Sequence, residues 1–291
     1  MFDGFERARI STSGAEIELV RGGSGPPVLL LHGAPQSHVM WHAIAAGLGE
    51  RYTVVASDLR GYGDSSKPPG GGDHSGYSFR VMASDQVDAM RSLGFTRFAL
   101  VGHDRGGRVA HRLALDHPDA VERLAVLDIV PTDHVYSHVD RALATAYFHW
   151  FFLIQPEPLP EMMIEPVAVE FLHRALGAAR DDPSFFDPAA LAEYERCFAD
   201  PATIHGLCED YRAAASIDLE HDRDDRGRHV ECPLLALWGA RSVVGRLYDP
   251  VAVWREYASD VRGHAVDAGH YLAEEGPDET LVVLRDFLDG S

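Results

Sequence analysis

One short segment, Gly102-His103-Asp104-Arg105-Gly106-Gly107, constrains the fold of this chain more than any other part of its sequence. The apolar residues 98–101 before it predict a buried strand, and residues 108–115 after it have a spacing compatible with a helix. The glycines permit a sharp turn between the two elements. The segment therefore predicts a strand-turn-helix unit whose turn presents the carboxylate of Asp104.

A carboxylate at such a turn predicts one type of chemistry, because it attacks a saturated carbon rather than a carbonyl carbon. It displaces a leaving group from an sp³ carbon and forms an alkyl ester with the enzyme. A water molecule activated by histidine must then release that ester. The alternative is an ordinary glycine-rich connection in which Asp104 caps the helix, a position that aspartate favours.

The rest of the chain alternates strand patterns with helix patterns. The first strands have no helix between them and are expected to form an antiparallel edge. This alternation predicts an α/β fold with a mostly parallel, doubly wound sheet. We predict helices at 79–93, 108–117, 250–257 and 277–288, and strands at 16–21, 27–31, 52–57, 98–101, 121–129, 234–238 and 261–267.

One long stretch, residues 131–227, breaks the alternation because it is rich in helix patterns and aromatic residues and has no clear buried strand. The sheet pattern resumes at Pro233, so both ends of the stretch must return to one core. This favours an inserted α-helical cap over an independent helical domain, with residues 1–130 and 228–291 together forming the core. Such a cap covers the carboxyl ends of the strands, where open α/β sheets bind ligands.

The balance of charge limits the partners of the chain. Its 26 Lys and Arg residues against 45 Asp and Glu give a formal charge of −19. That charge repels nucleic acid phosphates and anionic membranes, so we expect neither as a partner. An anionic small substrate would need local positive charge at the site, which directs attention to Arg105 and Arg108.

The sequence also indicates a location and a redox state. No stretch approaches the roughly 18 apolar residues of a membrane span, and residues 1–6 lack the features of a secretory signal, so we expect a cytoplasmic protein. Cys197, Cys208 and Cys232 are odd in number and lie outside any CxxC pattern. They suggest neither a disulfide framework nor a zinc site, and we expect no cofactor or metal.

A nucleophilic Asp104 needs a base and an acid that orients it. His270 lies in Asp267-Ala268-Gly269-His270-Tyr271, on the loop after the last predicted strand. The segment 237–244 offers no carboxylate, whereas Asp128 is embedded in an apolar run where an unpaired charge would be costly. We therefore expect Asp128 to orient His270 and to stabilise its charged form.

A second turn, His32-Gly33-Ala34-Pro35, directly follows the predicted strand at 27–31. It can place the backbone N–H of Ala34 beside that of Arg105, which gives two donors for the carbonyl oxygen of an ester intermediate. The alternative is a simple Gly-Pro turn.

Asp104-Arg105-Gly106-Gly107-Arg108, taken with Asp128 and His270, resembles the fluoroacetate dehalogenases, also called haloacetate dehalogenases, of the α/β-hydrolase superfamily. The likeness extends into the cap at 147–150, 155–160 and 208–212. It implies the α/β-hydrolase fold, with Asp104 as nucleophile, His270 as base and Asp128 as its partner.

The resemblance also implies roles for five other residues. Arg105 and Arg108 would hold the substrate carboxylate, and His149, Trp150 and Tyr211 would point donors at the departing halide. Without the resemblance, core packing explains Trp150 as well, and Arg105 could pair with a neighbouring acid.

These patterns predict hydrolytic dehalogenation of short 2-haloacids, in which fluoroacetate and water give glycolate and fluoride. An epoxide hydrolase, which shares the Asp-His-Asp set, is the first alternative, but such enzymes typically carry an aromatic residue where this chain has Arg105. A haloalkane dehalogenase would give the two arginines no anion to bind. A ligand receptor without catalysis is the alternative from another class. We expect a homodimer, the commonest oligomer.

Overall fold

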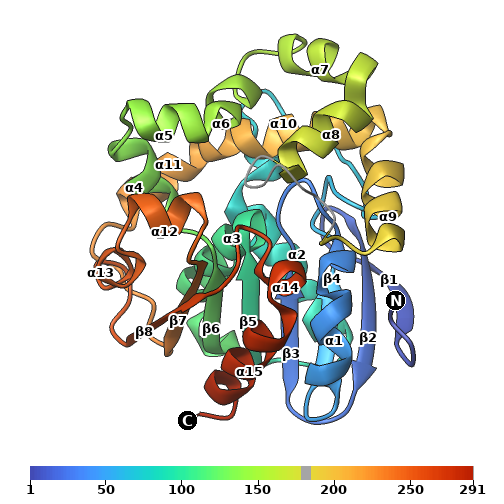
Figure 1. Cartoon of the computed structure of the whole chain (residues 1–291), viewed down its shortest axis with the longest axis vertical. Coiled ribbons are helices and arrows are strands. Elements are labelled where there is room, and N and C mark those ends of the chain that lie inside the picture. The colour runs from blue at the N-terminus through green and yellow to red at the C-terminus, as the bar shows by residue number, and fades with distance from the viewer. Residues whose placement is uncertain (178–184, 291) are drawn as a thin grey trace.

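The computed structural model describes residues 1–177 and 185–290, and its eight strands form one sheet in the order β1-β2-β4-β3-β5-β6-β7-β8 (Figure 1). Strands β3 to β8 run parallel, while β2 runs antiparallel to both β1 and β4. The predicted antiparallel edge is therefore confirmed. The strands are β1 Glu6–Ser11, β2 Glu16–Gly23, β3 Pro27–Leu31, β4 Thr53–Ser57, β5 Phe98–His103, β6 Val121–Leu127, β7 Leu234–Gly239 and β8 Val261–Val266.

The central strands are apolar because both of their faces are covered. All residues of β4 and β5 are buried, which explains their nearly continuous apolar sequence. Strand β1 is the exception that sequence analysis did not predict. It lies at the edge of the sheet, and its residues alternate between exposed and half-buried, so it has no apolar run.

Helices cover both faces of the sheet, as a doubly wound fold requires. α1 and α15 contact each other on one face, and α2 and α3 contact each other on the other (Figure 1). α3 begins at Asp104, four residues before the predicted start, and α1, α12 and α14 were not predicted. The core helices are α1 His42–Gly49, α2 Phe79–Ser92, α3 Asp104–Asp116, α12 Val243–Leu247, α13 Pro250–Trp254, α14 Leu272–Glu275 and α15 Pro277–Leu288.

Between β6 and β7 the described residues form helices and no strand. These helices lie over one end of the sheet, as Figure 1 shows. Residues 178–184 of the predicted cap lie outside the described residues, and the division of the chain at residues 130 and 227 stays a prediction. The helices are α4 Thr132–Ser137, α5 Arg141–Ala146, α6 Phe148–Leu153, α7 Leu159–Ile164, α8 Ala168–Gly177, α9 Pro188–Phe198, α10 Pro201–Ala214 and α11 Ile217–Asp224.

Cys197, Cys208 and Cys232 are free, and burial raises the pKa of the Cys197 thiol to about 12.

Among residues 1–177 and 185–290, no helix combines the length and the apolar character that a bilayer span needs.

Candidate active site

Asp104 lies at the junction of β5 and α3 with a φ of 45°, in the left-handed region that residues with a side chain rarely adopt. Close approach of the backbone makes this turn possible. A Cβ atom at Gly106 would lie 2.4 Å from the carbonyl oxygen of His32, and one at Gly102 would lie 2.4 Å from the carbonyl oxygen of Gly106. The glycines around Asp104 are therefore required by space, and the strained turn presents its carboxylate.

The Asp104 carboxylate is ionised and has one oxygen engaged. The backbone N–H of Ala34 donates to Oδ1 at 3.0 Å, and no hydrogen bond from the described residues reaches Oδ2. Burial alone would raise the pKa of Asp104, but the charges of His270 and Arg108 contribute to lowering it to about 2. The side chain thus has the charge state of a nucleophile and one oxygen free to attack.

The predicted acid and base are in contact. Nδ1 of His270 lies 2.6 Å from Oδ2 of Asp128, and the backbone N–H of Gly239 donates to the other Asp128 oxygen at 3.0 Å. Burial disfavours the imidazolium, but the hydrogen bond and charge of Asp128 outweigh it, and the pKa of His270 is raised above its ordinary 6.5. Asp128 fixes the ring so that Nε2 is left for a water molecule.

Two residues that sequence analysis missed hold the loop of His270. The Glu275 carboxylate accepts hydrogen bonds from the backbone N–H groups of Gly269, at 2.6 Å, and Tyr271, at 3.1 Å. Burial lowers the pKa of His103 to about 3, so its ring is neutral and Nε2 donates to the carbonyl oxygen of His270 at 2.8 Å. Glu275 stands in no pattern that would have marked it, whereas His103 lies within the segment 102–107 that directed attention to Asp104.

His32 fixes the turn that supplies the Ala34 donor. The backbone N–H of Leu59 donates to His32 Nε2 at 3.0 Å, so the ring proton sits on Nδ1, which lies 2.9 Å from the carbonyl oxygen of Gly33. Burial lowers the pKa of His32, which keeps this neutral form. The His32 ring thus connects the turn of residues 32–35, beside Asp104, to the segment that follows β4.

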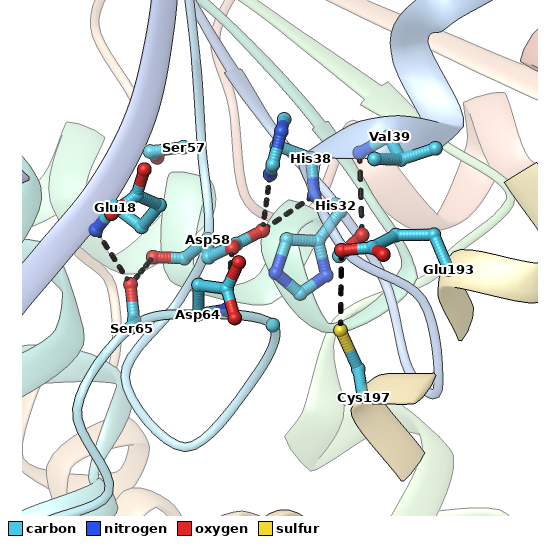
Figure 2. Close-up of polar contacts among 12 residues, drawn as sticks. Glu18, His32, His38, Val39, Ser57, Asp58, Asp64, Ser65, Glu193 and Cys197 are labelled. Atoms are coloured by element: carbon cyan, nitrogen blue, oxygen red, sulfur yellow. Dashed lines mark hydrogen bonds and ion pairs between the residues drawn. The ribbon is translucent and has the colours of Figure 1, made fainter. Parts of the chain in front are cut away.

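A buried polar cluster lies next to His32 (Figure 2). Its centre is Asp58, whose carboxylate accepts from the backbone N–H of His38 at 2.7 Å and faces the Nδ1 of the same residue at 2.8 Å. Ser65 donates to the carbonyl oxygen of Asp58 at 2.8 Å. The cluster provides hydrogen-bond partners for backbone groups at the carboxyl end of β4. It thereby supports the neighbouring turn of residues 32–35.

Asp104 and His270 both open into one cavity of about 380 Å³. The three predicted halide-binding residues line the same cavity, and so does Tyr147, whose ring stacks on Trp150 at 5.6 Å. The full lining is Ala34, Pro35, Asp104, Ala146, Tyr147, Phe148, His149, Trp150, Leu153, Phe171, Arg174, Ala175, Leu207, Tyr211, Val243, His270 and Tyr271.

The predicted halide donors are neutral. Burial lowers the pKa of His149 to about 4 and raises that of Tyr211 well above 10, so one is an imidazole and the other a phenol at neutral pH. The Tyr211 ring lies 5.9 Å from the ring of His149 and 6.0 Å from that of Trp150. Cap helices α6 and α10 therefore gather three groups with N–H or O–H donors on one side of the cavity.

The structure gives the two predicted carboxylate-binding arginines different surroundings. Arg105 is fully buried and paired with Asp210, and its Nη1 has no hydrogen-bond partner among the described residues. Arg108 donates from Nη1 to the carbonyl oxygen of Val130 and to Thr132 Oγ1, both at 3.0 Å. Its guanidinium lies 4.5 Å from the centre of the Trp150 ring. Within the described part of the chain, neither arginine is among the residues that line the large cavity.

Comparison with known proteins agrees with this geometry. Residues 26–277 match the family model described as "alpha/beta hydrolase fold". The chain belongs to this family. The hydrolase-fold protein is 50% identical to a fluoroacetate dehalogenase from Burkholderia sp over 99% of this chain and 95% of that protein. It is 33% identical to a soluble epoxide hydrolase from Corynebacterium sp. (strain C12), over 91% of each.

A solved structure gives the same result. A crystal structure from Nostoc sp PCC 7120, assigned to the alpha/beta hydrolases, superposes on the hydrolase-fold protein with a TM-score of 0.99 at 55% identity and covers 100% of both chains. The resemblance and the fold class that the sequence predicted are confirmed.

Proposed function

We propose that this protein hydrolyses the carbon–halogen bond of short 2-haloacids, converting fluoroacetate and water to glycolate and fluoride. The observation that carries the proposal is the cavity in which an ionised carboxylate, Asp104, faces three neutral donors, His149, Trp150 and Tyr211. The relative that is 50% identical bears the name of this activity.

In the first step, Oδ2 of Asp104 attacks the α-carbon of the haloacid. A carbon–oxygen bond forms, the carbon–halogen bond breaks, and the halide leaves with the bonding electron pair. Charge builds on the halogen only as its bond breaks, so the three donors act mainly in the transition state. Each donor is worth about 2–4 kcal/mol by analogy with an oxyanion donor.

In the second step, His270 takes a proton from a water molecule, and the resulting hydroxide attacks the carbonyl carbon of the ester on Asp104. The carbonyl oxygen on that carbon is Oδ1, which the Ala34 N–H already contacts. The proton then passes from His270 to the leaving glycolate oxygen. Asp104 is left with the second proton of the water, and its loss to solvent restores the carboxylate. The new oxygen stays in Asp104, while the glycolate hydroxyl oxygen comes from the side chain.

The substrate carboxylate needs cations at the opposite end of the site. Arg105 Nη1 and Arg108 Nε are buried nitrogens without a partner among the described residues. A carboxylate that reached both arginines would supply the missing partners and place the α-carbon before Asp104.

An epoxide hydrolase is the second candidate, and one observation favours it. Tyr147 and Tyr211 are two of the three tyrosines that line the cavity with Asp104 and His270, and paired phenols can protonate the oxygen of an opening epoxide. The relative that is 33% identical is named a soluble epoxide hydrolase.

A panel of fluoroacetate, chloroacetate and styrene oxide separates the two candidates. We expect halide from both acids, no diol from the epoxide, and no product from the Asp104→Asn variant. Diol without halide from either acid would favour the second candidate. A single turnover in water labelled with oxygen-18 tests the ester: the first glycolate formed should carry unlabelled oxygen, and direct labelling from solvent would contradict a covalent intermediate.

We further propose a cytoplasmic homodimer as the working form. Light scattering after size exclusion measures the mass in solution, and cell fractionation tests the location.

A further inference from the structure

The hydrogen bonds that the Arg105 guanidinium makes with the described residues all go to Asp210 of cap helix α10. Arg105 Nε donates to Asp210 Oδ2 at 2.8 Å, and Nη2 donates to the Asp210 carbonyl oxygen at 3.0 Å and also contacts Oδ1. Both side chains are completely buried. The Tyr62 hydroxyl donates to Asp210 Oδ2 at 2.6 Å. The pair therefore joins cap helix α10 to α3, the helix that begins at Asp104. Both carboxylate oxygens and the carbonyl oxygen of Asp210 accept hydrogen bonds.

Aromatic rings fix the plane of the same guanidinium. Its carbon lies 4.3 Å from the centre of the Tyr211 ring and 4.9 Å from that of the Phe79 ring. Tyr211 follows Asp210 on α10. Asp210 therefore accepts hydrogen bonds from the edge of the Arg105 guanidinium, while the Tyr211 ring packs against its face. With Nε and Nη2 taken, Nη1 is the donor left over.

We infer that Asp210 is a positioning residue: it holds the Arg105 guanidinium off Asp104 and leaves Nη1 for the substrate carboxylate. This inference rests on the proposed dehalogenation. Arg105 follows Asp104 directly in the chain, and a buried guanidinium without Asp210 would have the nucleophile as a nearby anionic partner. A hydrogen bond to Asp104 Oδ2 would stabilise the electron pair that attacks carbon.

The role predicts a specific kinetic signature for Asp210→Asn. The substitution keeps the size of the side chain but removes its charge. Binding of an anion should not weaken, because the surroundings of Arg105 then carry one negative charge fewer. Attack should slow, because the guanidinium is free to pair with Asp104. Turnover thus falls while affinity for the anion is kept, whereas general damage to the fold would reduce both.

The experiment measures kcat by halide release and the Kd of glycolate, a carboxylate without halogen, by calorimetry. We expect Asp210→Asn to lower kcat by about tenfold or more while the Kd of glycolate rises by no more than about twofold. Asp85→Asn is the matched control, since Asp85 forms another buried pair with an arginine, Arg60, and does not line the cavity. Its kcat per folded molecule should stay that of the wild type.

Tyr62→Phe provides a second variant in case Asp210→Asn does not fold. It removes one hydrogen bond to Asp210 and keeps the charge, so we expect kcat to fall by about two- to fivefold. A kcat of Asp210→Asn close to that of the wild type, a tenfold weaker Kd at unchanged kcat, or an unchanged Tyr62→Phe would overturn the role of Asp210. A wild type that releases no halide would instead contradict the proposed function.

Discussion

His270 Nδ1 lies 2.6 Å from Asp128 Oδ2, although 142 residues and an entire helical insertion separate the two in the chain. Asp128 follows β6 and His270 follows β8, so the contact passes over the end of β7. There the Gly239 N–H binds the second oxygen of Asp128. Strand β7 lies between the strands that precede the acid and the base, and its last backbone N–H orients the carboxylate toward the imidazole.

His270→Asn should trap the enzyme as an ester on Asp104. Alkylation of Asp104 needs no base, whereas hydrolysis of the ester does, so the intermediate forms and persists. Intact-mass measurement after exposure to chloroacetate should show one carboxymethyl group per chain. Asp104→Asn/His270→Asn should show none, and His264→Asn, which alters an exposed histidine of β8, should behave as the wild type. An unmodified His270→Asn protein would argue against the covalent route.

Asp128→Asn should change the pH dependence of turnover as well as its rate. His270 acts as a base only when neutral, and Asp128 raises its pKa above 6.5, so activity should rise with pH through a value above 6.5. Without the carboxylate this pKa falls, and the acid limb of the kcat profile should move to lower pH while the maximum drops about 10²- to 10⁴-fold. An acid limb that stays in place would assign it to another group.

Arg108→Leu should raise KM for haloacids. Its guanidinium is buried beside the nucleophile turn, and Nε has no partner among the described residues, so a substrate carboxylate would gain a charge-assisted hydrogen bond there. Loss of that bond should cost about 1.5–3 kcal/mol, or roughly 10- to 150-fold in KM. Steady-state halide release measures it, with the exposed Arg223→Leu as control. Unchanged kinetics would remove Arg108 from the site.

Glu274→Gln should remove a pH dependence of stability. Glu274 of α14 is buried, and it accepts hydrogen bonds from Tyr194 at 2.9 Å and Gln36 at 2.5 Å. Burial raises its pKa to about 8 from an ordinary 4.5, so the folded state binds more protons than the unfolded state between these values. The free energy of unfolding therefore falls as pH rises through that window, by at most ~1.4 kcal/mol per pKa unit.

The Gln variant lacks this titration, so its stability relative to the wild type should improve from about pH 5 to about pH 9. Urea unfolding at both pH values measures the change. The exposed Glu220→Gln serves as control and should show no such trend. A constant difference between variant and wild type would indicate that Glu274 is ionised throughout.

Much of the fold follows from local patterns in the sequence. The largely apolar strands β3 to β7 could be predicted because burial on both faces favours apolar residues. Strand β1 could not, because an edge strand pairs through its backbone and needs no apolar run. The start of α3 was placed too late because the glycines around Asp104 are poor helix formers, whereas contact with β5 and β6 holds that turn in a helix.

The chemistry-bearing residues of the site were easier to predict than their supports. Asp104 and His270 stand at turns that follow strands, and Asp128 interrupts an apolar run, so each has a local signal. Asp210 and Glu275 have none: each acts through a contact that exists only once cap, loop and sheet are assembled. The pairing of Arg105 with an acid was considered from the sequence, but the acid could not be named.

The ion pair between Arg105 and Asp210 bears on how small molecules enter and leave. Raising the cap helices away from the sheet would pull these fully buried charges away from each other and break their hydrogen bonds. Phe148 and Arg174, by contrast, line the cavity and are themselves exposed to solvent. We therefore expect haloacid, halide and glycolate to enter and leave the cavity beside these two residues. The cap helices should stay in contact with the sheet during each turnover.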